Sequence, residues 1–164
     1  MLMVIAFFIF IAIVTSGGED KPTTPTTDAD GQTIAAAATT DKNILQGSGT
    51  LGDYQVEIVT ARRETTEFLN EELLLVTYKW TNNSNDAKSF GVALDDIAYQ
   101  DGVQCTWTIS GDREVNLEHA DLKPGATMEL TIAYTLVNTT SPVEIEVART
   151  FSSTPKVVKT FVIA

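Results

Sequence analysis

The sequence predicts an all-β domain over residues 48–164, folded as an antiparallel β-sandwich of about seven or eight short strands. Three observations indicate this fold. From residue 51 onward apolar side chains recur at every second position, turn-forming residues separate these stretches, and no later stretch keeps a helical period. Short strands separated in this way are typical of two packed sheets, because each strand offers one apolar face for burial.

Four segments show the alternation most clearly, with apolar residues on one face and polar residues on the other: 54–58, 74–80, 128–136 and 143–147. Further strands are predicted at 89–94, 97–99, 103–109 and 157–163. Residues 70–75 are ambiguous, because their two glutamates and three leucines also have helix propensity. Trp80 is in phase with the apolar face of its segment, so we expect it in the core.

The turns between these segments contain the residue types that tight turns require. Residues 82–86 are asparagine, serine and aspartate, which tolerate a left-handed backbone, and residues 100–102 end in an Asp-Gly pair typical of a hairpin. Residues 123–125, Lys-Pro-Gly, place proline and glycine at the second and third positions of a type II turn. Such short turns favour antiparallel pairing of the strands they join.

The first 18 residues contain no charged side chain and predict a segment that enters a membrane. Their length is at the lower limit for a spanning helix, and small residues near Ser16 fit a signal-peptide cleavage site, so an uncleaved anchor and a removable signal both stay open. The cysteine of a lipoprotein signal is missing there. Residues 19–47, rich in threonine, proline and alanine, predict a disordered linker. The domain is therefore expected outside the cytosol, at the membrane or secreted.

The composition excludes some partners. The formal net charge is −11, from 22 acidic and 11 basic side chains. Such a surface repels the phosphates of nucleic acid and of anionic lipid headgroups, so we expect no nucleic acid as a partner and membrane contact only through residues 1–18. The single cysteine, Cys105, cannot form an internal disulfide and is expected to be a small buried hydrophobic residue.

Three motifs in order resemble a known family: SFGVALDDIAYQDGVQ, LKPGATMELTIAY and SPVEIEVARTFSS. Residues 50–164 resemble the C-terminal domain, of unknown function, of Gram-positive lipoproteins and membrane-anchored surface proteins. The resemblance implies an immunoglobulin-like sandwich. Family members have a lipoprotein signal or a single membrane helix and then a low-complexity linker, and this chain shares that layout except for the lipidated cysteine. The family has no established catalytic residues, so the resemblance assigns none here.

The sequence shows no constellation of residues for catalysis, a metal or a cofactor. The chain has one histidine, His119, and one cysteine, Cys105, whereas a zinc site needs three or four such ligands. The acidic residues near 95–101 and 112–121 lack the spacing of a calcium-binding loop. We therefore expect no cofactor, no metal and no enzymatic activity. A hydrolase based on Cys105 and His119, or on an acidic pair, stays an alternative.

The long connection between residues 109 and 126 is the candidate binding region, because loops of this length in compact domains often carry function. The candidate binding residues in and beside it are Trp107, Asp112, Arg113, Glu114 and His119. The first interpretation is a non-catalytic surface module that binds a protein or a cell-wall component. An accessory structural ectodomain of a membrane complex is an alternative with the same sequence features.

Overall fold

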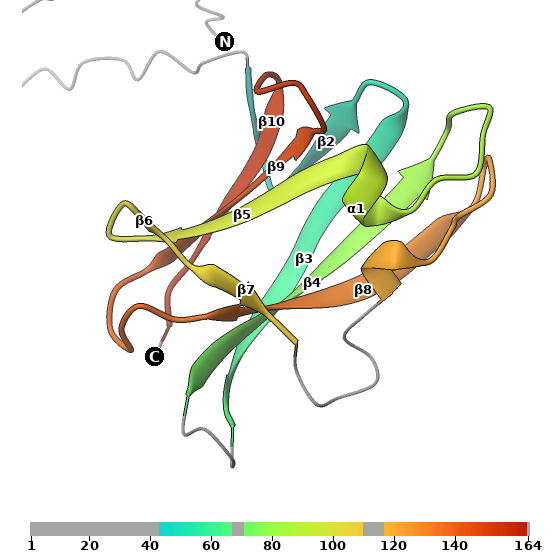
Figure 1. Cartoon of the computed structure of the whole chain (residues 1–164). Coiled ribbons are helices and arrows are strands. Elements are labelled where there is room, and N and C mark those ends of the chain that lie inside the picture. The colour runs from blue at the N-terminus through green and yellow to red at the C-terminus, as the bar shows by residue number, and fades with distance from the viewer. Residues whose placement is uncertain (1–42, 67–70, 110–116, 164) are drawn as a thin grey trace, which may run out of the picture. The chain divides into compact units, whose positions relative to one another are not determined.

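The computed structural model describes residues 43–66, 71–109 and 117–163, and these form a β-sandwich of two five-stranded sheets (Figure 1). One sheet, named here the β9 sheet, has the strand order β1-β10-β9-β5-β6, and the other, the β4 sheet, has the order β2-β3-β4-β8-β7. The predicted β-sandwich is confirmed. Its elements are β1 (Ile44–Gln46), β2 (Ser48–Leu51), β3 (Tyr54–Thr65), β4 (Glu72–Asn82), α1 (Phe90–Ala93), β5 (Leu94–Gln100), β6 (Val103–Gln104), β7 (Thr106–Thr108), η1 (Leu117–His119), β8 (Thr127–Thr135), β9 (Val143–Arg149) and β10 (Lys156–Phe161).

The core lies between the sheets and consists of the apolar faces that the alternation predicts. At its centre Phe90 packs against Tyr78 and Trp80, with ring centroids 5.4 and 5.8 Å apart. Trp80 is fully buried, which confirms its predicted position. Strand β4 departs from a half-buried strand, because Leu73 and Leu75 are buried too and form a separate small cluster. This strand is therefore apolar on both faces over its first half.

The described chain changes sheet four times, and two of these changes, β1 to β2 and β6 to β7, join edge strands of the two sheets. Gly47, between β1 and β2, has a φ of +72°; its N–H donates to Val158 of one sheet and its carbonyl accepts from Ile58 of the other. Cys105, between β6 and β7, is buried, as predicted, and its N–H donates to the carbonyl of Ala98. Strands that bend from one sheet into the other leave less free edge for pairing with another chain.

The close approach of β2 to β1 requires glycine at position 49. A β-carbon built there would lie 2.9 Å from Cβ of Leu45 and would also clash with Cδ1 of that side chain. We expect Gly49→Ala to lower the free energy of unfolding by about 1–3 kcal/mol, because the β1–β2 corner must move. Urea unfolding followed by circular dichroism measures this loss. In a double-mutant cycle with Leu45→Ala the two losses should not add, and strictly additive losses would contradict the steric explanation.

The strand predicted at 89–94 is wrong, because residues 90–93 form the helical turn α1. Phe90, Val92 and Leu94 alternate in the sequence, but the buried residues of the turn are Phe90 and Ala93, at helical spacing. The N–H groups of Val92 and Ala93 both bond to the carbonyl of Ser89. One turn of helix thus directs the Phe90 ring into the core.

Other boundaries also differ from the expectation. The segment 103–109 is two strands in different sheets, and the ambiguous segment 70–75 contributes to β4, which begins at Glu72. Strand β1 lies inside the range 19–47 assigned to the linker, and it pairs parallel to β10, whereas the other strand pairs are antiparallel. The sheet therefore begins earlier than the sequence indicates.

The predicted anchor or signal, residues 1–18, and nearly all of the predicted linker lie outside the described residues. Among the residues that the structure does describe, no helix has the length and apolar character needed to cross a membrane.

Candidate functional site

The short helix η1 is fixed to the sandwich by hydrogen bonds of the residues that follow it. The backbone of Leu122 pairs with that of Lys88, and the buried side-chain amide of Asn82 donates to the Leu122 carbonyl at 2.8 Å. Helix η1 also packs against α1, where a β-carbon on Gly91 would be 3.7 Å from Nδ1 of His119. A small residue in α1 thus allows η1 to lie close to it.

Two of the predicted binding residues meet at the carboxylate of Glu118. Trp107, on the edge strand β7, donates its indole Nε1–H to Oε2 of Glu118 at 3.2 Å. The imidazole Nε2 of His119 lies 3.1 Å from Oε1. The Glu118 side chain is only 11% exposed, whereas the His119 side chain is 78% exposed. The indole N–H thus provides a hydrogen bond to a carboxylate that has little contact with water.

A second carboxylate, that of Asp96 on β5, joins the two sheets. Tyr134 of β8 donates its hydroxyl hydrogen to Oδ2 of Asp96, and the Tyr78 hydroxyl of β4 lies 2.8 Å from that of Tyr134. Both tyrosines are buried. Asp96 alternates in phase with the buried Leu94, which directs its side chain between the sheets. The result is a chain of polar groups across the core.

Burial raises the pKa of Asp96 to about 6, from a usual 3.8. The hydrogen bond from Tyr134 opposes this rise, and the charges of Glu118 and Asp95 contribute to it. Burial also holds the pKa values of Tyr78 and Tyr134 well above the usual 10.0, so both phenols stay protonated at neutral pH. A carboxyl group with a pKa of this size changes its charge in weakly acidic solution, and such groups are frequent at functional sites.

Exposed apolar side chains stand on both sequence flanks of residues 110–116. Trp107 is 45% exposed, Ile109 is 65% exposed and Leu117 is 42% exposed. Together with Glu118 and His119 we name these three residues the η1 surface. Large apolar groups that stay in solvent beside charged groups often mark a contact site.

The other three predicted residues, Asp112, Arg113 and Glu114, lie outside the described residues. The structure therefore brings together Trp107 and His119 of the predicted set, through a residue that the set does not include. The sequence contains no local signal for this arrangement, because Trp107 and Glu118 are eleven positions apart.

Sequence reasoning places both Glu118 and Asp96 among solvated acidic residues and so misses them. For Asp96 a signal exists: it alternates with Asp95 and Ile97 and is in phase with the apolar Leu94 and Ala98. An acidic residue on the apolar face of a strand is a candidate for a buried polar contact. Glu118 has no comparable signal, because the short helix η1 has no periodic pattern.

Cys105 lacks the features of a catalytic nucleophile. Burial raises the pKa of its thiol, which favours the unreactive protonated form. Both Cys105 and His119 are described, and no hydrogen bond joins them, since His119 contacts Glu118. Across the described ranges, no group of three or more His, Cys, Asp or Glu residues could hold a metal ion. The geometry thus gives no support to a hydrolase based on Cys105 and His119.

The described residues form a small β-sandwich, and its η1 surface has an exposed indole beside partly buried carboxylates. The chain belongs to the family described as Domain of unknown function (DUF5067), which matches residues 29–149. This membership confirms the resemblance inferred from the three motifs. The family description assigns no function. No curated protein matches the chain significantly.

Three solved structures share the fold. A Bacillus subtilis "putative lipoprotein" has a TM-score of 0.57 at 12% identity, over 71% of this chain and 38% of that one. A Staphylococcus aureus "putative lipoprotein" has a TM-score of 0.54 at 11% identity, over 70% of this chain and 90% of that one. An uncharacterized beta-sandwich protein of Clostridium difficile has a TM-score of 0.55 at 10% identity, over 77% and 99%. The chain thus spans well under half of the Bacillus protein, and at these identities the likeness shows the fold alone.

Proposed function

We propose that this chain is a non-catalytic extracytoplasmic surface module that binds a protein or a cell-envelope component. It is anchored by residues 1–18 or secreted after their removal, and the η1 surface makes the contact. The observation that carries this proposal is Trp107, an indole that stays 45% exposed although a hydrogen bond to Glu118 fixes its orientation.

An exposed indole held in one orientation suits binding for two physical reasons. The side chain loses little conformational freedom when a partner covers it, because the bond to Glu118 already restrains it. Tryptophan also offers a large apolar area, and it is among the residues that contribute most to interfaces. Ile109 and Leu117 add apolar area, and His119 adds a polar group at the edge. An apolar centre with a polar rim is the usual anatomy of an interface.

The location outside the cytosol is supported by the uncharged segment 1–18 and the threonine- and proline-rich stretch after it. The names of the Bacillus and Staphylococcus structures point to the same compartment. The net charge of −11 disfavours contact with nucleic acid. A protein or an uncharged or cationic envelope component is therefore the partner class that this surface fits best.

A photo-crosslinking amino acid at position 109 of the full chain tests both parts of this proposal on intact cells. Irradiation should give one dominant adduct with a surface component, whereas the same amino acid at Val162, which is 81% exposed, should not give it. Adding Trp107→Ser should lower the yield at least fivefold, because loss of an interface tryptophan costs about 1 kcal/mol or more. Equal adducts from both positions would contradict the site, and adducts with cytosolic proteins alone would contradict the location.

A further inference from the structure

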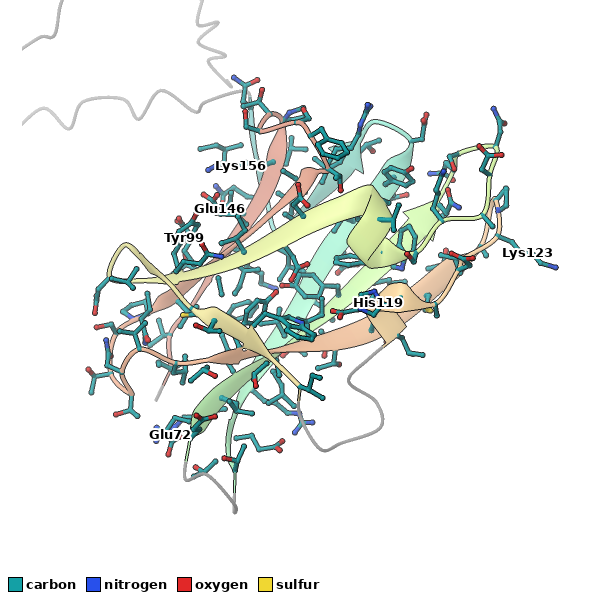
Figure 2. All side chains as sticks on the ribbon, in the orientation of Figure 1. Glu72, Tyr99, His119, Lys123, Glu146 and Lys156 are labelled. Carbon is teal, nitrogen blue, oxygen red and sulfur yellow. The ribbon has the colours of Figure 1, made fainter. Side chains whose placement is uncertain are left out.

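A groove on the outer face of the β9 sheet lies away from the η1 surface. Two adjoining hollows of about 340 and 470 Å³ form it, and Glu146 and Lys156 line both. Figure 2 shows Tyr99, Glu146 and Lys156 in a row across β5, β9 and β10, apart from His119 at η1. We name the groove the outer groove; the residues that define it are Asp95, Ile97, Glu144, Glu146, Phe151 and Lys156.

Strand register gives the first hollow of the outer groove an apolar floor with carboxylates beside it, whereas the second hollow is lined mainly by polar groups. Ile97 on β5 lies opposite Glu146 on β9, and Tyr99 lies opposite Glu144. Because side chains alternate along a strand, these residues share the outer face, whereas Ile145 between the two glutamates is buried in the core. Most of the surface that lines the first hollow is apolar. A ligand for this face therefore needs an apolar group as well as charge.

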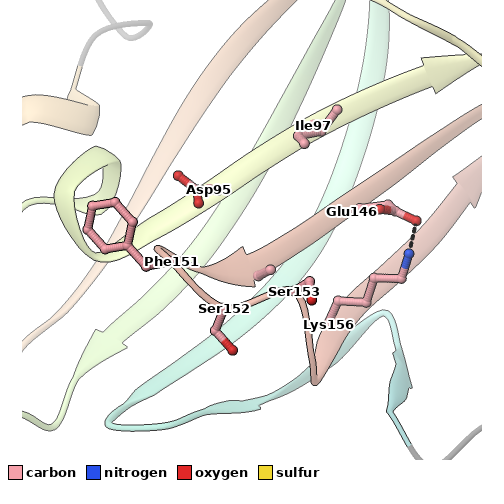
Figure 3. A pocket seen from close by; sticks show the side chains of 8 residues that line it. Asp95, Ile97, Glu146, Phe151, Ser152, Ser153 and Lys156 are labelled. Carbon is pink, nitrogen blue, oxygen red and sulfur yellow. Dashed lines mark hydrogen bonds and ion pairs between the residues drawn. The ribbon is translucent and has the colours of Figure 1, made fainter.

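Phe151, in the turn between β9 and β10, forms one wall of the first hollow (Figure 3). Its side chain is fully exposed, and its backbone has a φ of +63°, a conformation that bulky residues rarely adopt. Figure 3 shows Phe151 and Asp95 toward one end of the hollow and the ion pair of Glu146 with Lys156 toward the other. An aromatic ring that contacts none of the core contributes little to folding, but it adds apolar area to a groove that a partner can fill.

The charges of the outer groove are mainly negative. Four carboxylates line the two hollows, those of Asp95, Asp101, Glu144 and Glu146, and the basic residue there is Lys156. Lys156 is already paired with Glu146. Within the described part of the chain, the ion pairs involve neither Asp95 nor Glu144. A cationic partner would thus find at least two uncompensated carboxylates beside an apolar floor.

We propose that the outer groove binds an extended basic segment of a partner protein. One apolar side chain of the segment lies against Ile97 and Phe151, and lysine or arginine side chains lie beside Asp95 and Glu144. The distance along β9 from residue 148 to residue 144 is about 13 Å, which is the length of four to five residues of extended peptide. Alternate side chains of such a peptide point to the same face, so a basic–apolar–basic pattern at every second residue fits the groove. This surface is separate from the η1 surface and does not depend on the function proposed above.

Fluorescence anisotropy of the labelled peptide Ac-KSLSKSK-amide, titrated with the full chain in a neutral detergent, tests the proposal. The peptide presents three lysines and one leucine on one face when extended. Asp95→Asn together with Glu144→Gln should raise its Kd about fivefold, as expected for the loss of two exposed ion pairs. The matched control is Glu57→Gln with Glu129→Gln, which removes two exposed carboxylates from the β4 sheet and should change the Kd less than twofold. Equal weakening by both double variants, or no binding of the peptide, would overturn the proposal.

Phe151→Asn tests the apolar contact separately. Asparagine tolerates a left-handed backbone, so this substitution removes the ring without strain in the turn. It should raise the Kd of Ac-KSLSKSK-amide about fivefold and change that of Ac-KSSSKSK-amide less than twofold, because the second peptide has no leucine to lose. An equal effect on both peptides, or an effect on neither, would contradict the proposed position of the apolar side chain.

Discussion

Trp80→Ala is expected to lower the free energy of unfolding by about 3–5 kcal/mol, a large part of the stability of a domain of this size. The indole is fully buried and packs edge-on against Phe90 and at a tilt against Tyr54, with ring centroids 5.8 and 6.1 Å away. The two sheets hold the walls of this space apart, so truncation leaves a cavity. Urea unfolding followed by circular dichroism measures the loss, because the signal does not depend on tryptophan fluorescence.

Trp80→Phe is the matched control. Among the described residues the Trp80 indole Nε1 has no hydrogen-bond partner, so phenylalanine removes an unsatisfied donor together with part of the volume. The two effects oppose each other, and we expect a net loss of about 1 kcal/mol. If Trp80→Phe lost as much stability as Trp80→Ala, cavity formation would not be the main cost, and the packing explanation would be wrong.

The strands that sequence alone predicts are those with one apolar and one polar face. Strands β8 and β9 alternate along most of their length, and the core side of β4 alternates as well, so their existence and the orientation of Trp80 follow from the period of two. This information is local, because the sequence of each strand shows which of its faces is apolar. The sequence does not show which strand lies beside it.

The elements that sequence reasoning does not predict depend on contacts between distant residues. The apolar–polar alternation at 103–109 does not reveal that the Cys105 N–H donates to the Ala98 carbonyl and that the chain passes there from one sheet to the other. Strand β1 exists because Leu45 pairs beside Val157, more than a hundred residues later. The turn α1 forms where Phe90 can reach the rings of Tyr78 and Trp80. None of these partners is visible from local periodicity.

For the candidate site, too, sequence predicts the local features but not the contacts between distant residues. The long connection and its flanking Trp107 and His119 follow from sequence, because loop length and residue type are local features. That both contact Glu118 does not follow, and neither does the contact of Asp96 with Tyr134, which comes from the opposite sheet. Sequence thus indicates which segment to inspect, whereas the fold decides which charges become buried.

The partly buried Asp96 makes the stability of the domain depend on pH, because its pKa differs between the folded and the unfolded chain. Its pKa is about 6 in the folded chain and near 3.8 when exposed. Between these values the folded state binds more protons than the unfolded state, so stability falls as the pH rises through this window. The groups that face Asp96 are Asp95, Glu118 and Tyr134, and the two carboxylates contribute to the rise in its pKa. At neutral pH the unfavourable contribution of the ionised form is complete, with an upper limit of about 3 kcal/mol.

Asp96→Asn is therefore expected to raise the free energy of unfolding by about 1–3 kcal/mol at about pH 7.5 and to have little effect near pH 4. Asparagine keeps an oxygen that can accept the Tyr134 hydroxyl, and it carries no charge at any pH. Urea unfolding at both pH values gives the difference. The control is Asp95→Asn, an exposed neighbour whose charge is the smallest contribution to the raised pKa of Asp96, so this variant should keep the direction of the pH dependence with only a small decrease in its size. A loss of stability at about pH 7.5 in Asp96→Asn would show that the charged hydrogen bond with Tyr134 outweighs the cost of burial, contrary to the raised pKa.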